Sequence, residues 1–242
     1  MNSDNRERGV SDLFRLVFGG MNEMINRFDE SKAFDYENGF YLTTSVNRMG
    51  NILAHYELYK KIIDLPGAVV ECGVFRGGTL IQLATFRELL ETENSRKIIG
   101  FDVFGEFPEA KNLADQKFRE SWVNETNNEF LTREELAQSF AYKGVGNVEL
   151  VKGDILETAR QYVADHPELK IAFLHIDTDI YEPAKEALDV FYDRVVKGGV
   201  VVFDDYGTVG GETLAVDEFF GESVPELRKI RFSHGKPSYL VR

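Results

Sequence analysis

Hydrophobic positions divide the chain into a mixed first part and a longer second part with a regular alternation. Residues 1–44 predict short helices and a loop, with an apolar cluster at 13–18. Across residues 45–63, apolar side chains recur at three- and four-residue steps, which predicts an amphipathic helix. Pro66 and Gly67 follow this stretch and predict its end.

Beyond residue 67, short apolar runs alternate with helical stretches. The runs are rich in Val, Ile, Leu and Phe, and they predict strands at 68–74, 97–103, 148–153, 171–177 and 199–204. Helices are expected to begin near Gly78, Asp154, Pro183 and Gly211. This alternation is typical of a parallel sheet covered by helices on both faces. The last residues, 227–232 and 238–241, predict an antiparallel hairpin.

These elements predict one α/β domain over residues 1–242 with a Rossmann-like, mostly parallel seven-stranded sheet that ends in the hairpin. Residues 1–66 would form an N-terminal helical extension, and 67–242 the core. The segment 104–143 is too long for a simple crossover between strands. We expect it to form helices of a lid over the functional site.

Charge narrows the possible partners. The chain has 41 acidic and 28 basic side chains and a net charge of -13, which disfavours nucleic acid and anionic membrane surfaces. No apolar run approaches the roughly 20 residues that span a bilayer, and the first residues lack a secretory pattern, so we expect a cytoplasmic protein. Cys72, the single cysteine, lies in a predicted apolar strand and is interpreted as a buried hydrophobic residue.

A glycine-rich turn follows the first predicted strand. Residues 71–79 read Glu-Cys-Gly-Val-Phe-Arg-Gly-Gly-Thr and lead directly into a predicted helix. Such a turn lets a ligand approach the backbone and exposes the free amides of the helix start. We therefore predict cofactor contacts from Glu71, Gly73, Gly77, Gly78 and Thr79.

Residue types in this turn distinguish three ligands. A phosphate-binding P-loop requires a lysine where Thr79 stands, and the dinucleotide pattern requires a glycine where Phe75 stands. The spacing instead resembles the turn of methyltransferases, whose cofactor carries an amino acid carboxylate and ammonium. The acidic Glu71 suits that ammonium. A structural turn without a ligand is the alternative.

Acidic residues also end the second and third predicted strands. Asp102 is placed to accept hydrogen bonds from both hydroxyls of a ribose. Asp154, followed by Ile155, stands where a nucleoside cofactor would place its adenine, although Asp154 could equally be a helix N-cap. Together these strand ends predict a nucleoside lying across the carboxyl edge of the sheet.

Four aspartates follow the fourth and fifth predicted strands, namely Asp177, Asp179, Asp204 and Asp205. Carboxylates gathered at one sheet edge repel one another, so either a cation binds or some of them stay protonated. Oxygen ligands without a histidine or cysteine cluster favour Mg²⁺, which we assign to Asp177, Asp204 and Asp205. In the alternative, Asp179 caps the next helix and Asp205 caps a turn. His175 is expected to be a buried, hydrogen-bonded side chain.

The motifs together resemble the macrocin O-methyltransferase (TylF/MycF) family of Mg²⁺-dependent sugar O-methyltransferases, from about residue 43 to 220. The resemblance rests on Val-Val-Glu-Cys-Gly-Val-Phe-Arg-Gly-Gly at 69–78, His-Ile-Asp-Thr-Asp-Ile-Tyr-Glu-Pro at 175–183, Gly-Gly at 198–199, Phe-Asp-Asp-Tyr-Gly at 203–207 and Ala-Val-Asp-Glu-Phe at 215–219. It implies a class I methyltransferase fold, S-adenosylmethionine bound by the first motif and Asp102, and a metal held by Asp177, Asp204 and Asp205. It also implies a small acceptor that bears a sugar.

A mechanism follows from these expectations. Coordination to Mg²⁺ would lower the pKa of a sugar hydroxyl and orient it toward the methyl group. Asp177, or less favourably Asp179, would then accept the hydroxyl proton. Distant catechol-type enzymes carry a lysine three residues after the first metal ligand, but Ile180 occupies that position here, so no lysine base is expected. Residues 101–108, Phe-Asp-Val-Phe-Gly-Glu-Phe-Pro, exchange Gly and Glu relative to the family pattern.

Two other functions compete with this interpretation. Residues 177–179 read Asp-Thr-Asp, a pattern with which metal-dependent glycosyltransferases hold a nucleotide sugar, but that function leaves the glycine-rich turn unexplained. A scaffold that binds the cofactor without catalysis is the second rival, and the intact aspartates disfavour it. The cluster at 13–18 suggests a homo-oligomer or, equally, a packed arm.

Overall fold

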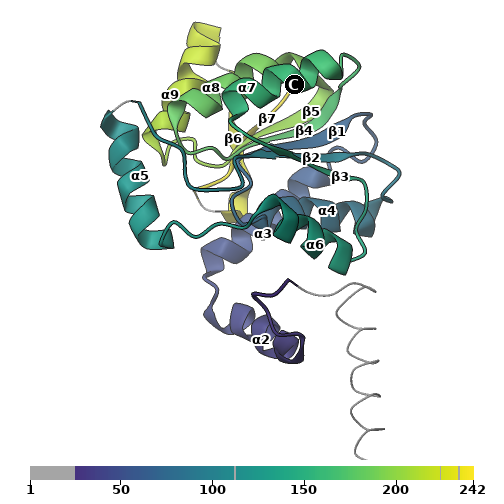
Figure 1. The fold of residues 1–242 in the computed structure, drawn as a ribbon. Helices are drawn as coiled ribbons and strands as arrows, with labels where there is room; N and C mark the ends of the chain where they lie inside the picture. The colour runs from purple at the N-terminus through teal and green to yellow at the C-terminus, as the bar shows by residue number, and fades with distance from the viewer. Residues whose placement is uncertain (1–24, 112, 224, 234) are drawn as a thin grey trace, which may run out of the picture.

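The structure is a computed structural model that describes residues 25–111, 113–223, 225–233 and 235–242 (Figure 1). The apolar cluster predicted at 13–18 lies outside the described residues. No helix in the described part of the chain is both long enough and apolar enough to cross a bilayer.

One sheet organises the described residues, and its seven strands follow the order β3-β2-β1-β4-β5-β7-β6. The strands are β1 (Ala68–Cys72), β2 (Ile98–Asp102), β3 (Val148–Lys152), β4 (Ile171–Ile176), β5 (Val195–Phe203), β6 (Arg228–Lys229) and β7 (Ser238–Val241). The first five are parallel, while β7 runs antiparallel to both β5 and β6. The predicted Rossmann-like, mostly parallel sheet with a terminal antiparallel hairpin is confirmed.

Helices cover both faces of this sheet, as the continuous apolar strands predict (Figure 1). They are α2 (Ala33–Thr43), α3 (Val46–Tyr59), α4 (Gly78–Leu90), α5 (Leu113–Thr126), α6 (Arg133–Tyr142), α7 (Ile155–Asp165), α8 (Tyr181–Phe191) and α9 (Gly210–Phe220). Alternate strand residues point to opposite layers, so Val70 packs with α7, α8 and α9, and Val69 packs with α3, α4 and α6. Cys72 is buried in the first layer, as expected.

The hairpin differs from its prediction at its first strand. The strand expected at 227–232 is confined to Arg228–Lys229, and a short 3₁₀ helix, η4 (Arg231–Ser233), follows it. Gly50 of α3 lies against the backbone at Phe232, where a Cβ at Gly50 would collide with the Phe232 carbonyl oxygen. Three further 3₁₀ helices are η1 (Glu30–Lys32), η2 (Tyr192–Arg194) and η3 (Gly221–Ser223).

The segment 104–143 contributes two helices with different surroundings. Helix α6 packs Leu136 and Phe140 into the core beside the sheet, and a capping box between Thr132 and Glu135 fixes its start. Helix α5 buries only Asp115 and stands at the edge of the molecule (Figure 1). Its position beside the carboxyl ends of the strands makes it a wall of the cavity described below.

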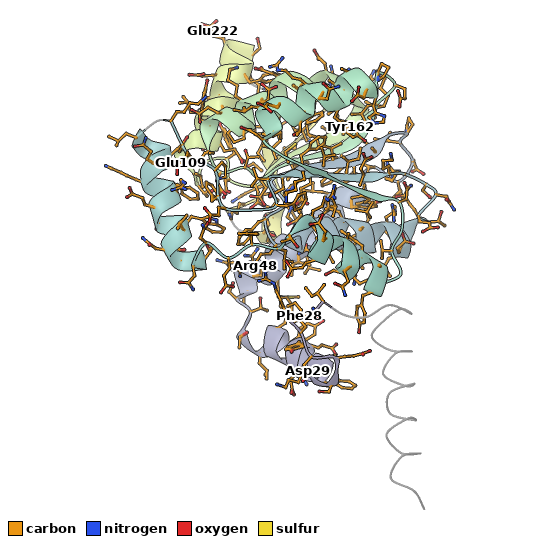
Figure 2. All side chains as sticks on the ribbon, viewed as in Figure 1. Phe28, Asp29, Arg48, Glu109, Tyr162 and Glu222 are labelled. Atoms are coloured by element: carbon orange, nitrogen blue, oxygen red, sulfur yellow. The ribbon has the colours of Figure 1, made fainter. Side chains whose placement is uncertain are left out.

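The N-terminal helices extend away from the sheet. Helix α3 begins at the N-cap Ser45, whose hydroxyl accepts a hydrogen bond from the Arg48 amide, as the predicted helix start requires. Helix α2 projects from the body of the molecule, and Figure 2 shows Phe28 and Asp29 on this projecting part. Large apolar side chains stay exposed along it and at the start of α3, including Leu42 and Val46.

Candidate active site

A cavity of about 830 Å³ opens at the carboxyl ends of the parallel strands. Its walls include the turn after β1, the ends of β2, β4 and β5, and residues such as Trp122 on α5. The size is typical of a site for a small molecule or cofactor. All site residues predicted from the sequence line this cavity except Gly77, which lies between the lining residues Arg76 and Gly78.

The glycine-rich turn brings β1 and β4 into backbone contact. Gly73 has a φ of 85°, and a Cβ there would collide with the carbonyl oxygen of Asp177. Gly77, with a φ of 78°, is the N-cap of α4, and a Cβ at Gly78 would meet only open space. The turn therefore requires glycine at 73 and 77 for conformation, while Gly78 keeps the start of α4 open toward the cavity.

Asp102 organises this turn. Its Oδ2 accepts hydrogen bonds from the amides of Val74 (2.8 Å) and Phe75 (2.9 Å), and its Oδ1 accepts one from the Phe104 amide (2.6 Å). Burial raises the pKa of the Asp102 carboxyl, whereas the three amides oppose that rise. The structure thus gives Asp102 a role in holding the loop that sequence reasoning did not foresee. Its predicted contact with a ribose stays a prediction.

Asp154 is the N-cap of α7, and its carboxylate accepts a hydrogen bond from the Leu156 amide at 2.9 Å. The capping interpretation is therefore confirmed. Asp154 and Ile155 also line the cavity, so an adenine contact is compatible with the cap and stays a prediction.

Glu71 is a buried acid with half of its carboxylate unmatched. Its Oε1 lies 3.1 Å from His175 Nδ1, while Oε2 has no hydrogen-bond partner. Burial raises the pKa of the Glu71 carboxyl, although His175 opposes the rise. Because Glu71 lines the cavity, the unmatched oxygen is available to a positively charged donor from a ligand.

Three aspartates form a compact cluster at the ends of β4 and β5. Asp177, Asp179 and Asp205 each place one carboxylate oxygen within 4.8 Å of the others. Removal from water and the neighbouring carboxylates raise the pKa of Asp177 and of Asp179 well above the ordinary value. A cluster with this excess of negative charge favours a proton or a cation.

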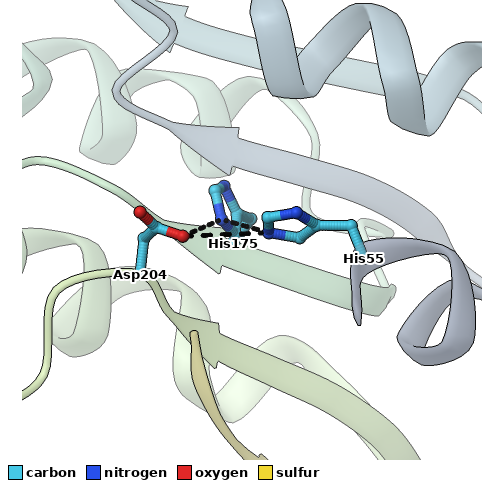
Figure 3. Close-up of side chains that lie close together, drawn as sticks. All are labelled: His55, His175 and Asp204. Atoms are coloured by element: carbon cyan, nitrogen blue, oxygen red, sulfur yellow. Dashed lines mark hydrogen bonds and ion pairs between the residues drawn. The ribbon is translucent and has the colours of Figure 1, made fainter. Parts of the chain in front are cut away.

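Asp204 lies beside this cluster but faces two histidines, as Figure 3 shows. Its Oδ1 is 3.9 Å from the Nε2 atoms of both His55 and His175, and it accepts a hydrogen bond from Asn51 Nδ2 at 3.3 Å. The structure therefore groups Asp179, rather than Asp204, with Asp177 and Asp205. Whether a metal gathers Asp177, Asp204 and Asp205 stays a prediction.

The two histidines form a buried chain that ends at Asp204. Their Nε2 atoms are 3.2 Å apart, and His175 Nδ1 reaches Glu71 on the other side. Burial acts to lower the pKa of His175, but Asp204 and Glu71 outweigh it and raise that pKa, whereas burial and His175 lower the pKa of His55 to about 3. A protonated His175 can donate hydrogen bonds to both Glu71 and a neutral His55. The buried, hydrogen-bonded His175 is confirmed, and the expectation of no histidine cluster is wrong.

Two further charged residues join the site from distant positions in the sequence. Lys236 places its Nζ 2.6 Å from Asp205 Oδ1 and 3.3 Å from Asp204 Oδ2. Glu212, in the first turn of α9, accepts a hydrogen bond from the Asp205 amide, while its Oε2 has no partner. The site therefore contains a lysine that the sequence comparison at Ile180 did not reveal, because that comparison concerned a single position.

The capping roles predicted as alternatives for Asp179 and Asp205 differ in the structure. Asp179 does not cap α8, because Ile180 is the N-cap residue and the Tyr181 amide donates to Asp115 of α5 at 2.9 Å. Asp205 does stabilise its turn, since its Oδ1 accepts a hydrogen bond from the Thr208 hydroxyl. Asp205 thus has a structural contact in addition to its place in the cluster.

Comparison with known proteins identifies the family. The model of the family described as macrocin O-methyltransferase (TylF) matches residues 26–226, most of the chain. The chain belongs to this family. The resemblance inferred from the motifs is confirmed, and the family model ends shortly before the hairpin that carries Lys236.

Two curated proteins that are similar to this chain are O-methyltransferases of Streptomyces species. The 8-demethyl-8-(2,3-dimethoxy-alpha-L-rhamnosyl)-tetracenomycin-C 4'-O-methyltransferase of Streptomyces olivaceus is 29% identical over 59% of this chain and 54% of its own length. The demethyldecarbamoylnovobiocin O-methyltransferase of Streptomyces niveus is 29% identical over 64% of this chain and 59% of its own length. The chain thus aligns with little more than half of each of these relatives.

Solved structures of the same kind share the fold. The calicheamicin methyltransferase CalS11 superposes with a TM-score of 0.68 at 25% identity, covering all of this chain and 94% of CalS11. The O-methyltransferase NovP superposes with a TM-score of 0.67 at 24% identity, covering 80% and 79% of the two chains. These likenesses agree with the Rossmann-like methyltransferase fold of the family.

Proposed function

We propose that this protein is an S-adenosylmethionine-dependent O-methyltransferase that methylates a hydroxyl of a sugar-bearing small molecule with the help of Mg²⁺ or another hard divalent cation. One observation carries the proposal. A single cavity joins a glycine-rich turn suited to a nucleoside cofactor with a carboxylate cluster that favours a cation. The family and the names of its sugar-modifying relatives support the acceptor class.

The cofactor half of the site fits the amino acid end of S-adenosylmethionine. The unmatched Oε2 of Glu71 suits the ammonium, and the turn at Gly73, Gly77, Gly78 and Thr79 keeps the backbone open for the carboxylate. Asp102 is proposed to accept the ribose hydroxyls through the lone pairs that its three amide bonds leave free. Asp154 and Ile155 would border the adenine.

The metal half fits a hard cation, because its donor atoms are carboxylate oxygens and because burial and neighbouring carboxylates raise the pKa of Asp177. We propose Asp177, Asp204 and Asp205 as ligands. A small rotation of Asp204 would be needed, since its Oδ1 now faces the histidines. When bound, the cation lowers the pKa of a coordinated hydroxyl.

Proton transfer is assigned to the aspartates that border the cavity. Asp177 is the proposed acceptor of the hydroxyl proton, and Asp179 is the second candidate because it also faces the cavity beside Asp205. Removal from water makes each a stronger base once it is deprotonated. The buried chain from Glu71 through His175 would hold Asp204 in place during the reaction.

The exposed apolar side chains of the N-terminal helices support a homo-oligomer as part of the proposal. Leu42 is 84% exposed and Val46 is 77% exposed, next to several exposed aromatic rings. Light scattering at several protein concentrations tests this part, and a monomer at all concentrations contradicts it.

The test of the activity is transfer of a labelled methyl group from S-adenosylmethionine to a panel of glycosylated natural products and nucleotide-linked sugars, with Mg²⁺ and with EDTA. Methyl transfer to a sugar hydroxyl that EDTA abolishes and Mg²⁺ restores is the expected result. Binding of UDP-sugars but not of S-adenosylhomocysteine, measured by calorimetry, would instead favour a glycosyltransferase. Cofactor binding without transfer to any acceptor would favour a scaffold.

A further inference from the structure

Lys236 lies on top of the carboxylate cluster. Its side chain is 44% exposed, whereas the side chains of its partners Asp204 and Asp205 are 12% and 5% exposed. The ammonium therefore stands between these two carboxylates and the open cavity, which Lys236 also lines. It reaches this place from the loop before β7, whose pairing with β5 fixes the base of the side chain.

Lys236 adds a lysine charge beside carboxylates of which one, Asp204, also lies 3.9 Å from His175. Among the described residues, it is the one lysine or arginine that forms an ion pair with Asp177, Asp179, Asp204, Asp205 or Glu212. Oε2 of the buried Glu212 has no hydrogen-bond partner, and burial and the nearby Asp205 raise the pKa of this carboxyl. A lysine ammonium is a compact charge on a flexible stem, so it can leave without moving the backbone.

We propose that Lys236 is a tethered cation that occupies the carboxylate site in the metal-free protein and must be displaced before a divalent cation binds. This inference rests on the metal site of the proposed function. Asp204 and Asp205 are both proposed metal ligands and both are the present partners of Nζ. A dication and an ammonium that share the same oxygens repel each other strongly at such distances, so the two cannot use them together.

The displacement changes both the metal affinity and the position of Lys236. The free energy of the Lys236 ion pairs is lost when the metal binds, so wild-type affinity is lower than the three proposed aspartate ligands alone would give. Because the stem of Lys236 is flexible, its ammonium can move away from Asp204 and Asp205 when the metal binds.

The test measures Mn²⁺ binding to the full chain by electron paramagnetic resonance, without cofactor or acceptor, so that it does not depend on activity. Lys236→Met should tighten Mn²⁺ binding by roughly tenfold or more, because it removes the competing charge. Lys197→Met is the matched control, since Lys197 is an exposed residue of β5 outside the cavity lining and its loss changes the net charge equally. It should leave the affinity within about twofold.

Lys236→Arg separates displacement from simple repulsion. The guanidinium pairs with carboxylates through two parallel hydrogen bonds and is harder to displace, so Mn²⁺ should bind more weakly than to the wild type. Circular dichroism and thermal unfolding verify that each variant folds. Equal Mn²⁺ affinity of the Arg variant and the wild type, or an unchanged affinity of the Met variant, overturns the inference and leaves the metal site intact. Absence of Mn²⁺ binding to all variants overturns the metal site itself, and the inference with it.

Discussion

The acidic side chains in the two halves of the sheet edge have different kinds of partner. In the cofactor half, at the ends of β1, β2 and β3, backbone amides match the acids, as in the three bonds to Asp102 and the helix cap at Asp154. In the metal half, at the ends of β4 and β5, carboxylates face carboxylates, and Lys236 and His175 supply the opposing charge. Apart from Oε2 of Glu71, which has no partner, the acids of the cofactor half are therefore matched without a ligand, whereas those of the metal half depend on side-chain charges. Ligand removal and charge changes should affect the two halves differently.

The largest effect is expected from Asp177→Asn in the metal half. Loss of a proposed metal ligand and base should lower the rate by roughly 10³-fold in single-turnover assays, while S-adenosylhomocysteine affinity stays within about twofold. Asp189→Asn, on the outer surface of α8, is the control and should leave the rate unchanged. A nearly normal rate for Asp177→Asn would reassign the base and weaken the distinction between the halves.

Asp102→Ala should produce the converse result in the cofactor half. The variant loses the acceptor for three backbone amides and the proposed ribose contact, so S-adenosylhomocysteine affinity should fall by about 10- to 100-fold. Mn²⁺ binding, measured separately, should stay within about twofold. Unaltered cofactor affinity in calorimetry would reject the ribose contact, and weakened Mn²⁺ binding would show that the halves are not independent.

Addition of a divalent cation should stabilise the folded protein by binding to the metal half. Saturating Mg²⁺ should raise the thermal unfolding midpoint by a few degrees, because a ligand that binds only the folded state adds its binding free energy. Asp205→Asn should abolish most of this shift in differential scanning fluorimetry. Ca²⁺ serves as a second hard cation, and an equal shift in the Asn variant would place the cation elsewhere.

The smallest effect is expected outside both halves, at the ion pair of Arg27 and Glu135. Hydrogen bonds from Arg27 and Thr132 lower the pKa of Glu135 to about 2, so they stabilise the folded state above the ordinary pKa of a glutamate, and this contribution is lost as the pH falls toward 2. Glu135→Gln should lower stability slightly at pH 7 and not at pH 2. Cofactor and Mn²⁺ affinities should remain unchanged, which denaturant unfolding and calorimetry can verify together.

Much of the fold could be predicted because it depends on local patterns. The five parallel strands, the start of α4 at Gly78 and the caps at Ser45 and Asp154 follow from periodicity and capping chemistry within a few residues. The short β6 was not predicted, and the residues after it contact Gly50 of a distant helix, which local patterns do not reveal.

The candidate site was predictable only where strand order brings residues together. Parallel strand ends place Asp102, Asp177 and Asp205 at one edge, as expected. The residues that form hydrogen bonds or ion pairs with the aspartates after β5 come from other elements, namely Asn51 and His55 on α3, Glu212 on α9 and Lys236 before β7. No spacing rule links these positions, because their distance along the chain bears no relation to their separation in space.

The close approach of Gly73 to the Asp177 peptide has a mechanical consequence. The Asp177 amide donates to the Cys72 carbonyl at 2.9 Å, so the turn proposed to hold the cofactor and the strand end that carries the proposed base are joined directly through the main chain. A shift of either backbone carries the other with it. We therefore expect main-chain geometry at this junction to influence the distance between methyl donor and acceptor in the proposed reaction.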